Sequence, residues 1–130
     1  MKVLLVDDSA FFLRAATRFL SGFAAVRDIV TAASGIEALR AVRHERPDLV
    51  LLDFNMPEMG GLETLRSIKA LQPGLPVIIV SLHDTADFRA AARAAGADGY
   101  VAKPDFATGL AEILAPEATV APARAPIPEL

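Results

Sequence analysis

Short, uninterrupted runs of Val, Ile and Leu divide the chain into segments. The clearest runs cover residues 3–6, 49–52 and 77–80. Because hydrophobic residues in these runs do not alternate with polar ones, they are typical of strands covered on both faces, as in a parallel sheet between two layers of helices. Residues 29–33 and 100–102 are weaker candidates of the same kind. The pattern therefore predicts five buried strands.

Amphipathic segments fill the intervals between these runs. Residues 9–22 are expected to form a helix, because apolar side chains recur there at intervals of three and four and leave Arg14 and Arg18 on the opposite face. A second helix is expected to begin at Ser34, whose spacing from Glu37 is that of a capping box. The apolar stripe of the first helix consists of Phe12, Ala16, Phe19, Leu20 and Phe23.

Three further helices are predicted from their start and stop signals. The third ends before Pro73, because a Pro-Gly pair stops a helix and turns the chain. The fourth extends from a cap at Asp84 to Gly96 and is expected to expose Arg89 and Arg93 to solvent. The fifth carries Pro104 in its first turn, where a missing N–H does no harm.

Strands and helices thus alternate as five consecutive βα units. This alternation favours right-handed crossovers and a three-layer α/β domain around one parallel sheet. From residue 116 onward the composition changes to mainly Pro and Ala. We expect a folded domain over residues 1–115 and a Pro/Ala-rich tail or linker over residues 116–130.

Composition and charge narrow the class of protein. A length of 130 residues suits one hydrophobic core, and 53% hydrophobic with 22% charged residues excludes disorder across the body of the chain. A net charge of −3 argues against direct binding of nucleic acid. The absence of Cys excludes thiolate catalysis and zinc-ribbon sites.

The apolar runs are also too short for targeting or membrane insertion. Asp7 interrupts the first run after four residues, which is short of the ~7–15 residues of a signal-peptide core. No run approaches the ~18 residues that span a bilayer. We therefore expect a soluble, cytoplasmic protein without a membrane partner.

Candidate chemistry gathers where the predicted strands end. Asp7 and Asp8 follow the first strand, Asp53 ends the third, Ser81 ends the fourth and Lys103 follows the fifth. The carboxyl ends of parallel strands meet at one edge of a sheet, where open α/β proteins bind ligands. Several carboxylates at one edge repel each other and favour a cation, and oxygen-only donors favour Mg²⁺, with Mn²⁺ as the second choice.

These groups are suited to phosphoryl transfer onto a carboxylate. A Lys ammonium and a Ser hydroxyl opposite the carboxylates would bind an anion, and phosphoryl transfer depends mainly on positioning and charge neutralisation. Each residue alone also has a structural interpretation, since Asp7, Asp8 or Ser9 is suited to capping the first helix and Lys103 to a solvated loop. Their joint order along the chain favours the functional interpretation.

The sequence resembles the receiver domain of response regulators, the CheY-like phosphoacceptor of bacterial two-component signalling. The resemblance covers residues ~2–115 and rests on residues 3–9 (VLLVDDS), residues 53–61 (DFNMPEMGG), Ser81 and residues 100–104 (YVAKP). It implies a flavodoxin-like (βα)5 fold with a five-stranded parallel sheet in the order 2-1-3-4-5. It also implies a signalling switch whose only catalysis is its own phosphorylation and dephosphorylation.

The resemblance implies roles for the acidic residues. Asp53 would accept a phosphoryl group from the phosphohistidine of a sensor histidine kinase or phosphotransfer protein. Asp8 and Asp53 would bind Mg²⁺ directly, together with the backbone carbonyl of Asn55, and Asp7 would act through a water molecule. Lys103 would contact the phosphoryl oxygens.

It also implies how the signal leaves the site. Ser81 would move toward the phosphoryl group and Tyr100 would repack in response. These movements would change a face formed by the fourth helix, the fifth strand and the fifth helix, which would bind a downstream protein. The peptide bond between Lys103 and Pro104 would be cis.

Four residues depart from the usual pattern of this family or occupy positions that vary within it. Leu82 stands where a small residue is usual, beside the path to Asp53, and would slow entry of the phosphodonor. Gly60 replaces a polar residue that usually caps the third helix. Asn55 and His83 occupy positions that tune dephosphorylation, so the lifetime of the phosphorylated state does not follow from the family.

Other classes of function are less well supported by the residues. A phosphatase of the haloacid-dehalogenase type needs a DxD pattern, whereas Asp53 is followed by Phe54 and Asn55. Nucleotide binders need a glycine-rich phosphate loop, and neither common form of that loop occurs. The stronger alternative is a pseudo-receiver that binds a partner without being phosphorylated. The cognate kinase, the output and the oligomeric state do not follow from the sequence.

Overall fold

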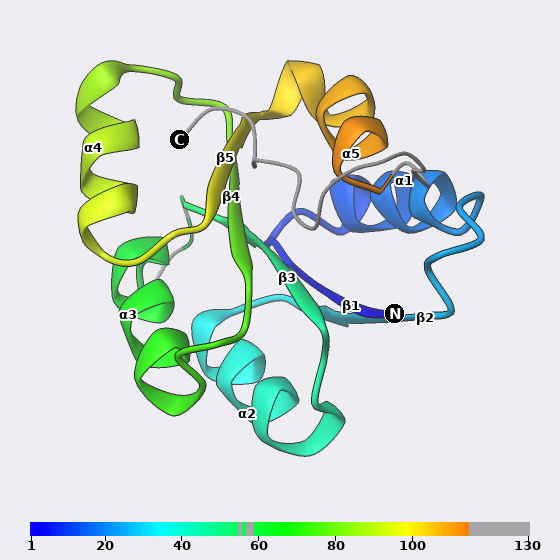
Figure 1. Cartoon of the computed structure of the whole chain (residues 1–130), viewed down its shortest axis with the longest axis horizontal. Helices are drawn as coiled ribbons and strands as arrows, with labels where there is room; N and C mark the ends of the chain where they lie inside the picture. Colours follow the sequence, from blue (N-terminus) through cyan, green and yellow to red (C-terminus); the bar gives the residue numbers. More distant parts are fainter. Residues whose placement is uncertain (55, 57–58, 115–130) are drawn as a thin grey trace.

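The computed structural model describes residues 1–54, 56 and 59–114. One parallel sheet runs through the middle of this part of the chain, and helices cover both of its faces (Figure 1). The strands follow the order β2-β1-β3-β4-β5, which confirms the predicted fold class and strand order. The strands are β1 (Lys2–Val6), β2 (Asp28–Ala32), β3 (Leu49–Asp53), β4 (Val77–Ser81) and β5 (Gly99–Ala102).

The helices alternate with the strands as the sequence predicts. They are α1 (Ala10–Leu20), α2 (Gly35–Glu45), α3 (Gly61–Leu71), α4 (Ala86–Ala94) and α5 (Phe106–Leu114), with the short 3-10 helix η1 (Lys103–Asp105) before α5. Helices α1 and α5 lie on one side of the sheet, and α2, α3 and α4 lie on the other (Figure 1). None of the described helices is long and apolar enough to cross a membrane.

Alternation of side chains along the strands produces two hydrophobic cores, one on each face of the sheet, so the expectation of a single core is wrong. In β1, Val3 and Leu5 belong to the core beneath α1 and α5, whereas Leu4 and Val6 belong to the core beneath α2, α3 and α4. Successive side chains of a strand point to opposite faces, so each buried strand contributes to both cores. This explains why the runs show no polar alternation.

Local signals set the ends of the helices. The Ser34 hydroxyl accepts a hydrogen bond from the Glu37 N–H at 3.1 Å, and the Glu37 carboxylate accepts one from the Ala33 N–H at 2.9 Å. The capping box is therefore confirmed, with its return bond one residue earlier than in the usual form. Helix α2 ends at Glu45, and the next residue, Arg46, caps it with a left-handed backbone at φ of 51°.

The cap of α4 differs from the prediction. The Thr85 hydroxyl accepts the hydrogen bond from the Phe88 N–H, so Thr85 and not Asp84 caps this helix. The Asp84 carboxylate forms an ion pair with Arg89 instead. Asp84 and Thr85 are both residue types that cap helices. Thr85 forms the cap because the Asp84 carboxylate is paired with Arg89, five residues further along the chain.

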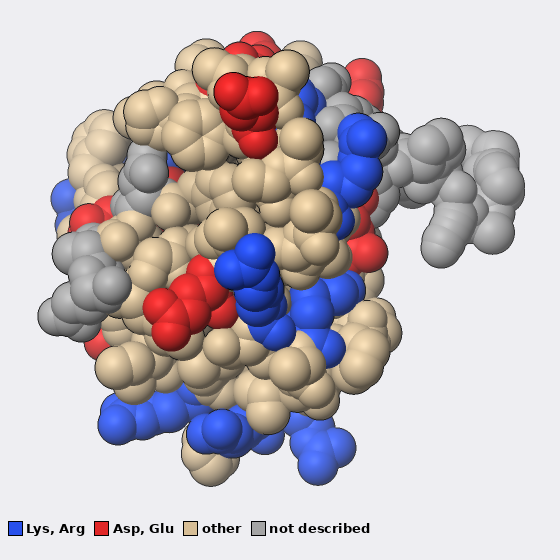
Figure 2. All heavy atoms as spheres, turned by 90° about the vertical axis from the view of Figure 1, so that its left-hand side faces the viewer, with Lys and Arg blue, Asp and Glu red and all other residues tan. Residues whose placement is uncertain are grey.

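Charged side chains of both signs lie on the face of the molecule that carries α3 and α4 (Figure 2). In this view Lys and Arg side chains gather along the lower edge, and acidic side chains adjoin basic ones near the centre. The expectation that Arg89 is solvent-facing is wrong, because only 22% of its side chain is exposed.

Candidate functional site

The register of the sheet brings the predicted site residues into one row. Asp53 ends β3 beside Val80 of β4, and Ser81 ends β4 beside Ala102 of β5. Lys103 follows Ala102 directly. Because all the strands are parallel, these side chains lie at the same carboxyl edge of the sheet.

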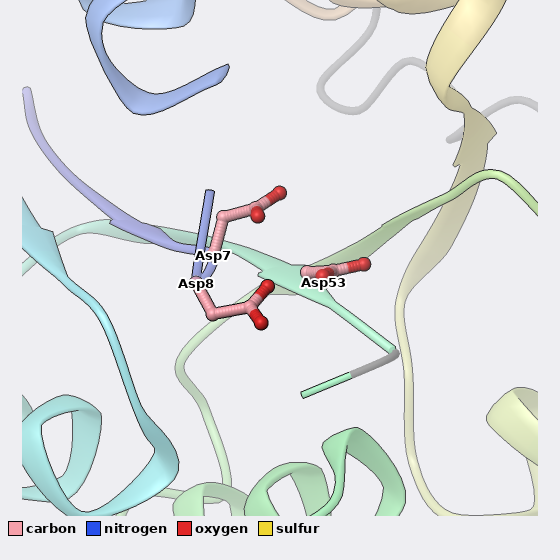
Figure 3. Close-up of side chains that lie close together, drawn as sticks. All are labelled: Asp7, Asp8 and Asp53. Atoms are coloured by element: carbon pink, nitrogen blue, oxygen red, sulfur yellow. The ribbon is translucent and has the colours of Figure 1, made fainter. Parts of the chain in front are cut away.

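Three carboxylates form a cluster at this edge. One carboxylate oxygen from each of Asp7, Asp8 and Asp53 lies within 4.8 Å of the others. Asp7 and Asp53 are 2% and 5% exposed, whereas Asp8 is exposed. Figure 3 shows Asp7 and Asp8 just beyond the tip of β1 and Asp53 at the tip of β3. Two buried acids and one exposed acid give a site that is anchored in the fold and open to solvent.

Contacts hold Asp7 in a fixed position. Its Oδ1 atom accepts a hydrogen bond from the Ser9 N–H at 2.9 Å, and its Oδ2 atom lies 2.8 Å from Lys103 Nζ. Apart from this ion pair, the buried Oδ2 atom has no hydrogen-bond partner among the described residues. Lys103 is therefore part of the acidic cluster, and its charge partly offsets the repulsion among the carboxylates.

An aromatic ring supports Lys103 from the side of α1. The Lys103 ammonium nitrogen lies 4.5 Å from the centre of the Phe12 ring, and Phe12 packs edge-on against Phe106 of α5. The helical pattern predicts that Phe12 lies on the buried stripe of α1, but it does not predict the contact with Lys103. The only indication in the sequence that Phe12 lies near the site is its position four residues after Asp8.

The loop after Asp53 passes very close to α3. A Cβ atom on Gly61 would lie 2.5 Å from Phe54 Cα and 2.8 Å from the Asp53 carbonyl oxygen, so only glycine fits there. The Gly61 N–H donates a hydrogen bond to the Phe54 carbonyl at 3.1 Å. Gly60 at the N-cap makes no side-chain capping bond. Asn55, predicted to bind the metal through its carbonyl, lies outside the described residues.

A chain of hydrogen bonds connects Ser81 to Tyr100. The His83 N–H donates to Ser81 Oγ at 3.0 Å, and the Tyr100 hydroxyl donates to the His83 carbonyl at 2.5 Å. Ser81 and Tyr100 are both fully buried. Burial raises the pKa of the Tyr100 phenol above its ordinary value of 10.0, and Asp84 acts in the same direction, whereas the Ser81 hydrogen bond and Arg89 lower it.

The two residues that follow Ser81, Leu82 and His83, are exposed at the edge of the site. Leu82 is 69% exposed, an unusual exposure for a large apolar side chain. The His83 ring stacks on Phe88 of α4, with 4.9 Å between ring centres and an interplanar angle of 20°. His83 thus contributes its backbone to the link with Tyr100 and its ring to α4.

The predicted cis peptide bond is wrong. No cis bond occurs among the described residues, so Lys103 and Pro104 are joined by a trans bond. Lys103, Pro104 and Asp105 form η1, and the Phe106 N–H donates to the Lys103 carbonyl. A trans bond allows Pro104 to lie in this helical turn, where its missing N–H is not needed.

The fold and the site together define a doubly wound α/β protein with an acidic pocket at the carboxyl edge of its sheet. A family model described as "Response regulator receiver domain" matches residues 3–115. The chain therefore belongs to the response regulator receiver domain family of two-component signalling, in which receivers act as phosphoacceptor switches.

Curated relatives carry this domain within longer proteins. The chain is 39% identical over 116 residues to the transcriptional regulatory protein PrrA of Mycobacterium tuberculosis, which covers 88% of this chain and 47% of PrrA. It is 46% identical over 106 residues to a protein-glutamate methylesterase/protein-glutamine glutaminase of Geobacillus kaustophilus, covering 80% of this chain and 30% of that protein. The chain thus spans less than half the length of these relatives.

Solved structures show the same fold. The Vibrio cholerae chemotaxis protein CheY4 matches with a TM-score of 0.79 and 30% identity, over 87% of this chain and 94% of that one. The response regulator domain of Thermotoga maritima CheB matches with a TM-score of 0.78 and 29% identity, over 88% and 90% of the two chains.

Proposed function

We propose that the chain accepts a phosphoryl group on Asp53 from the phosphohistidine of a sensor histidine kinase or phosphotransfer protein. The observation that carries this proposal is the cluster of Asp7, Asp8 and Asp53 at the carboxyl edge, with Lys103 paired to it. The buried carboxylate of Asp53 lies at the end of β3, which is the central strand of the sheet. Its position supports the role of nucleophile.

The donor set fits Mg²⁺, or Mn²⁺ in its place. Among the described residues, the candidate ligands are carboxylate oxygens that approach within 4.8 Å of one another, and hard cations prefer such ligands. Asp8 and Asp53 would bind the cation directly, and Asp7, held by Ser9 and Lys103, would act through water. The cation would supply charge neutralisation at the phosphoryl oxygens.

The proposed reaction needs one nucleophile and one cationic side chain. A carboxylate oxygen of Asp53 attacks phosphorus, the new O–P bond forms as the N–P bond to the donor histidine breaks, and the imidazole leaves with a proton from solvent. The Lys103 ammonium faces the negative charge of the phosphoryl oxygens. Attack of water on phosphorus then breaks the O–P bond, releases inorganic phosphate and restores the Asp53 carboxylate.

The proposed output is a change in the face formed by α4, β5 and α5. The acyl phosphate carries about −2 charge in place of the −1 of the Asp53 carboxylate, and it presents three acceptor oxygens that attract the Ser81 hydroxyl and Lys103. Ser81 is linked through His83 to Tyr100. A cavity of about 260 Å³ lies on this face between Asp84, Arg89, Asp105 and Glu112, among other residues. A downstream protein would bind there.

One observation favours the alternative of a pseudo-receiver that binds its partner without phosphorylation. Leu82 is a large apolar residue directly after Ser81 and projects into solvent at the rim of the site. It would obstruct a phosphodonor that approaches Asp53.

Intact-mass measurement separates the two functions. After incubation with Mg²⁺ and a small acyl or amido phosphate, we expect the addition of one phosphoryl group that hydroxylamine removes, as it does from an acyl phosphate. Asp53→Asn should abolish the addition, and Asp87→Asn, at an exposed position of α4, should keep it. No addition under conditions that phosphorylate an established receiver would refute the proposal. An addition restored only by Leu82→Ala would support the pseudo-receiver.

A further inference from the structure

Arg89 of α4 lies against the aromatic ring of the proposed switch residue. Its guanidinium carbon is 4.8 Å from the centre of the Tyr100 ring, which is within the range of a cation–π contact. Its Nε atom is 2.6 Å from Asp84 Oδ1. The side chain is 22% exposed, although the helical pattern predicts a solvated position. Arg89 thus bridges a carboxylate and a ring face.

Tyr100 has two other contacts, and neither of them covers the face of the ring over which Arg89 lies. Its hydroxyl is bonded to the His83 carbonyl, and Phe54 packs at 6.3 Å with an interplanar angle of 87°. Tyr100 is fully buried, so the guanidinium contributes to a shell that excludes water from the ring. A hydroxyl bond fixes one end of the ring, and the cation contacts its face.

We propose that Arg89 is a positioning residue that holds Tyr100 in its buried orientation, and that Asp84 holds Arg89 over the ring. This inference rests on the proposed function, in which Tyr100 is part of the switch. A cation–π contact of ordinary strength changes an equilibrium about two- to five-fold. Arg89 therefore biases the ratio of buried to exposed Tyr100 before any phosphoryl group is added.

The link extends from Arg89 to the phosphorylation site. Tyr100 is bonded to the His83 carbonyl, and the His83 N–H is bonded to Ser81. A side chain that stabilises one orientation of Tyr100 thereby also stabilises one position of the loop after β4. Asp84 lies in the same loop, and its ion pair with Arg89 connects this loop to α4. The loop, α4 and β5 are therefore each in contact with the other two.

The chain offers a selective probe of this proposal. It contains one Tyr and no Trp, so its tyrosine fluorescence and absorbance report on Tyr100 alone. We would measure quenching of that fluorescence by acrylamide at pH 7, without phosphodonor, in the full chain and in Arg89→Met. The Met side chain keeps the apolar stem and removes the charge.

We expect the quenching constant to rise about two- to five-fold in Arg89→Met. Asp84→Asn should raise it in the same direction by a smaller factor, and Arg89→Lys should restore a value close to the parent. The matched control is Arg93→Met, at an exposed position one turn further along α4. It should leave quenching unchanged. Unchanged quenching in Arg89→Met, or equal quenching in the Lys and Met variants, would overturn the proposal.

A spectroscopic pH titration of the phenol gives a second readout whose sign is decisive. Burial raises the pKa of Tyr100, whereas Arg89 lowers it by stabilising the phenolate. If the ring moves into solvent when Arg89 is replaced by Met, the pKa falls toward 10.0. If the ring stays buried without the cation, the pKa rises further, which would overturn the proposal.

These measurements do not depend on phosphorylation. The orientation of Tyr100 is measured in the absence of a phosphodonor, so failure of the proposed function would leave its result intact. The same Arg89→Met protein, tested for the phosphoryl addition at Asp53, should still be modified. Loss of the addition together with unchanged quenching would count against the role assigned to Arg89.

Discussion

Removal of the exposed carboxylate from the acidic cluster should stabilise the protein when no divalent cation is present. Two unit charges at 4.8 Å, the limit of separation within the cluster, repel by about 3.5 kcal/mol at an effective dielectric of 20. Asp8 is exposed, and Lys103 attracts every member of the cluster, so solvent and the ammonium reduce this value. We expect Asp8→Asn to raise the free energy of unfolding by about 1 kcal/mol in a chelating buffer.

The order of stability should change when Mg²⁺ is added. A ligand that binds only the folded state at ten times its dissociation constant stabilises a protein by about 1.4 kcal/mol. The parent chain should gain this amount, and Asp8→Asn should gain less than about half of it because one direct ligand is missing. Urea unfolding followed by far-ultraviolet circular dichroism, with chelator or with Mg²⁺, measures both quantities.

A control variant separates repulsion within the acidic cluster from the effect of lowering the net negative charge of the whole chain. Glu112→Gln removes one negative charge from an exposed position of α5, and Glu112 is not one of the clustered acids. It should change the free energy of unfolding by less than about 0.5 kcal/mol and keep the full gain from Mg²⁺. The reasoning is refuted if Asp8→Asn is less stable than the parent in chelator. An undiminished gain from Mg²⁺ in Asp8→Asn would exclude Asp8 as a ligand.

Two backbone predictions test how the loop and helix ends are built. Gly61→Ala should cost about 2–3 kcal/mol in urea unfolding, because the new Cβ would lie 2.5 Å from Phe54 Cα. Gly60→Ala, with nothing within 4 Å of its Cβ, should stay within about 0.5 kcal/mol of the parent, and equal losses would contradict this account. Arg46→Gly should raise stability by about 0.5–1 kcal/mol, because a side chain at φ of 51° is strained. Thermal unfolding measures it, and a lower midpoint would show that the Arg46 side chain contributes more than the strain costs.

The sequence predicts most of the fold because its signals are local. Uninterrupted Val, Ile and Leu runs identify strands with two covered faces, and each of β1, β3 and β4 appears within one residue of its predicted position. The order of strands came from the resemblance, since alternation alone permits several arrangements. The row of site residues at the carboxyl edge then follows from parallel pairing.

The errors arise where tertiary contacts decide between local options. Arg89 has the spacing of a surface residue, but Asp84 and Tyr100 attract its long side chain back toward the protein. Nothing in the local sequence distinguishes this arrangement, because Tyr100 lies on a different element. The trans bond before Pro104 lies in the helical turn of η1, and the local sequence does not distinguish it from the cis bond that the resemblance implies.

Alternation of side chains also places Asp53 and Tyr100 on opposite faces of the sheet. Leu52 and Phe54 belong to the core beneath α2, α3 and α4, so Asp53 between them points toward the α1 and α5 side. Tyr100 belongs to the core beneath α2, α3 and α4, and Val80 to the other, so Ser81 points toward α4. In the proposed switch, a change at Asp53 would therefore reach Tyr100 around the edge of the sheet and not through its core. The His83 backbone is bonded to both Ser81 and Tyr100 at that edge, so a short loop would be sufficient for the proposed connection between the acidic cluster and the face formed by α4, β5 and α5.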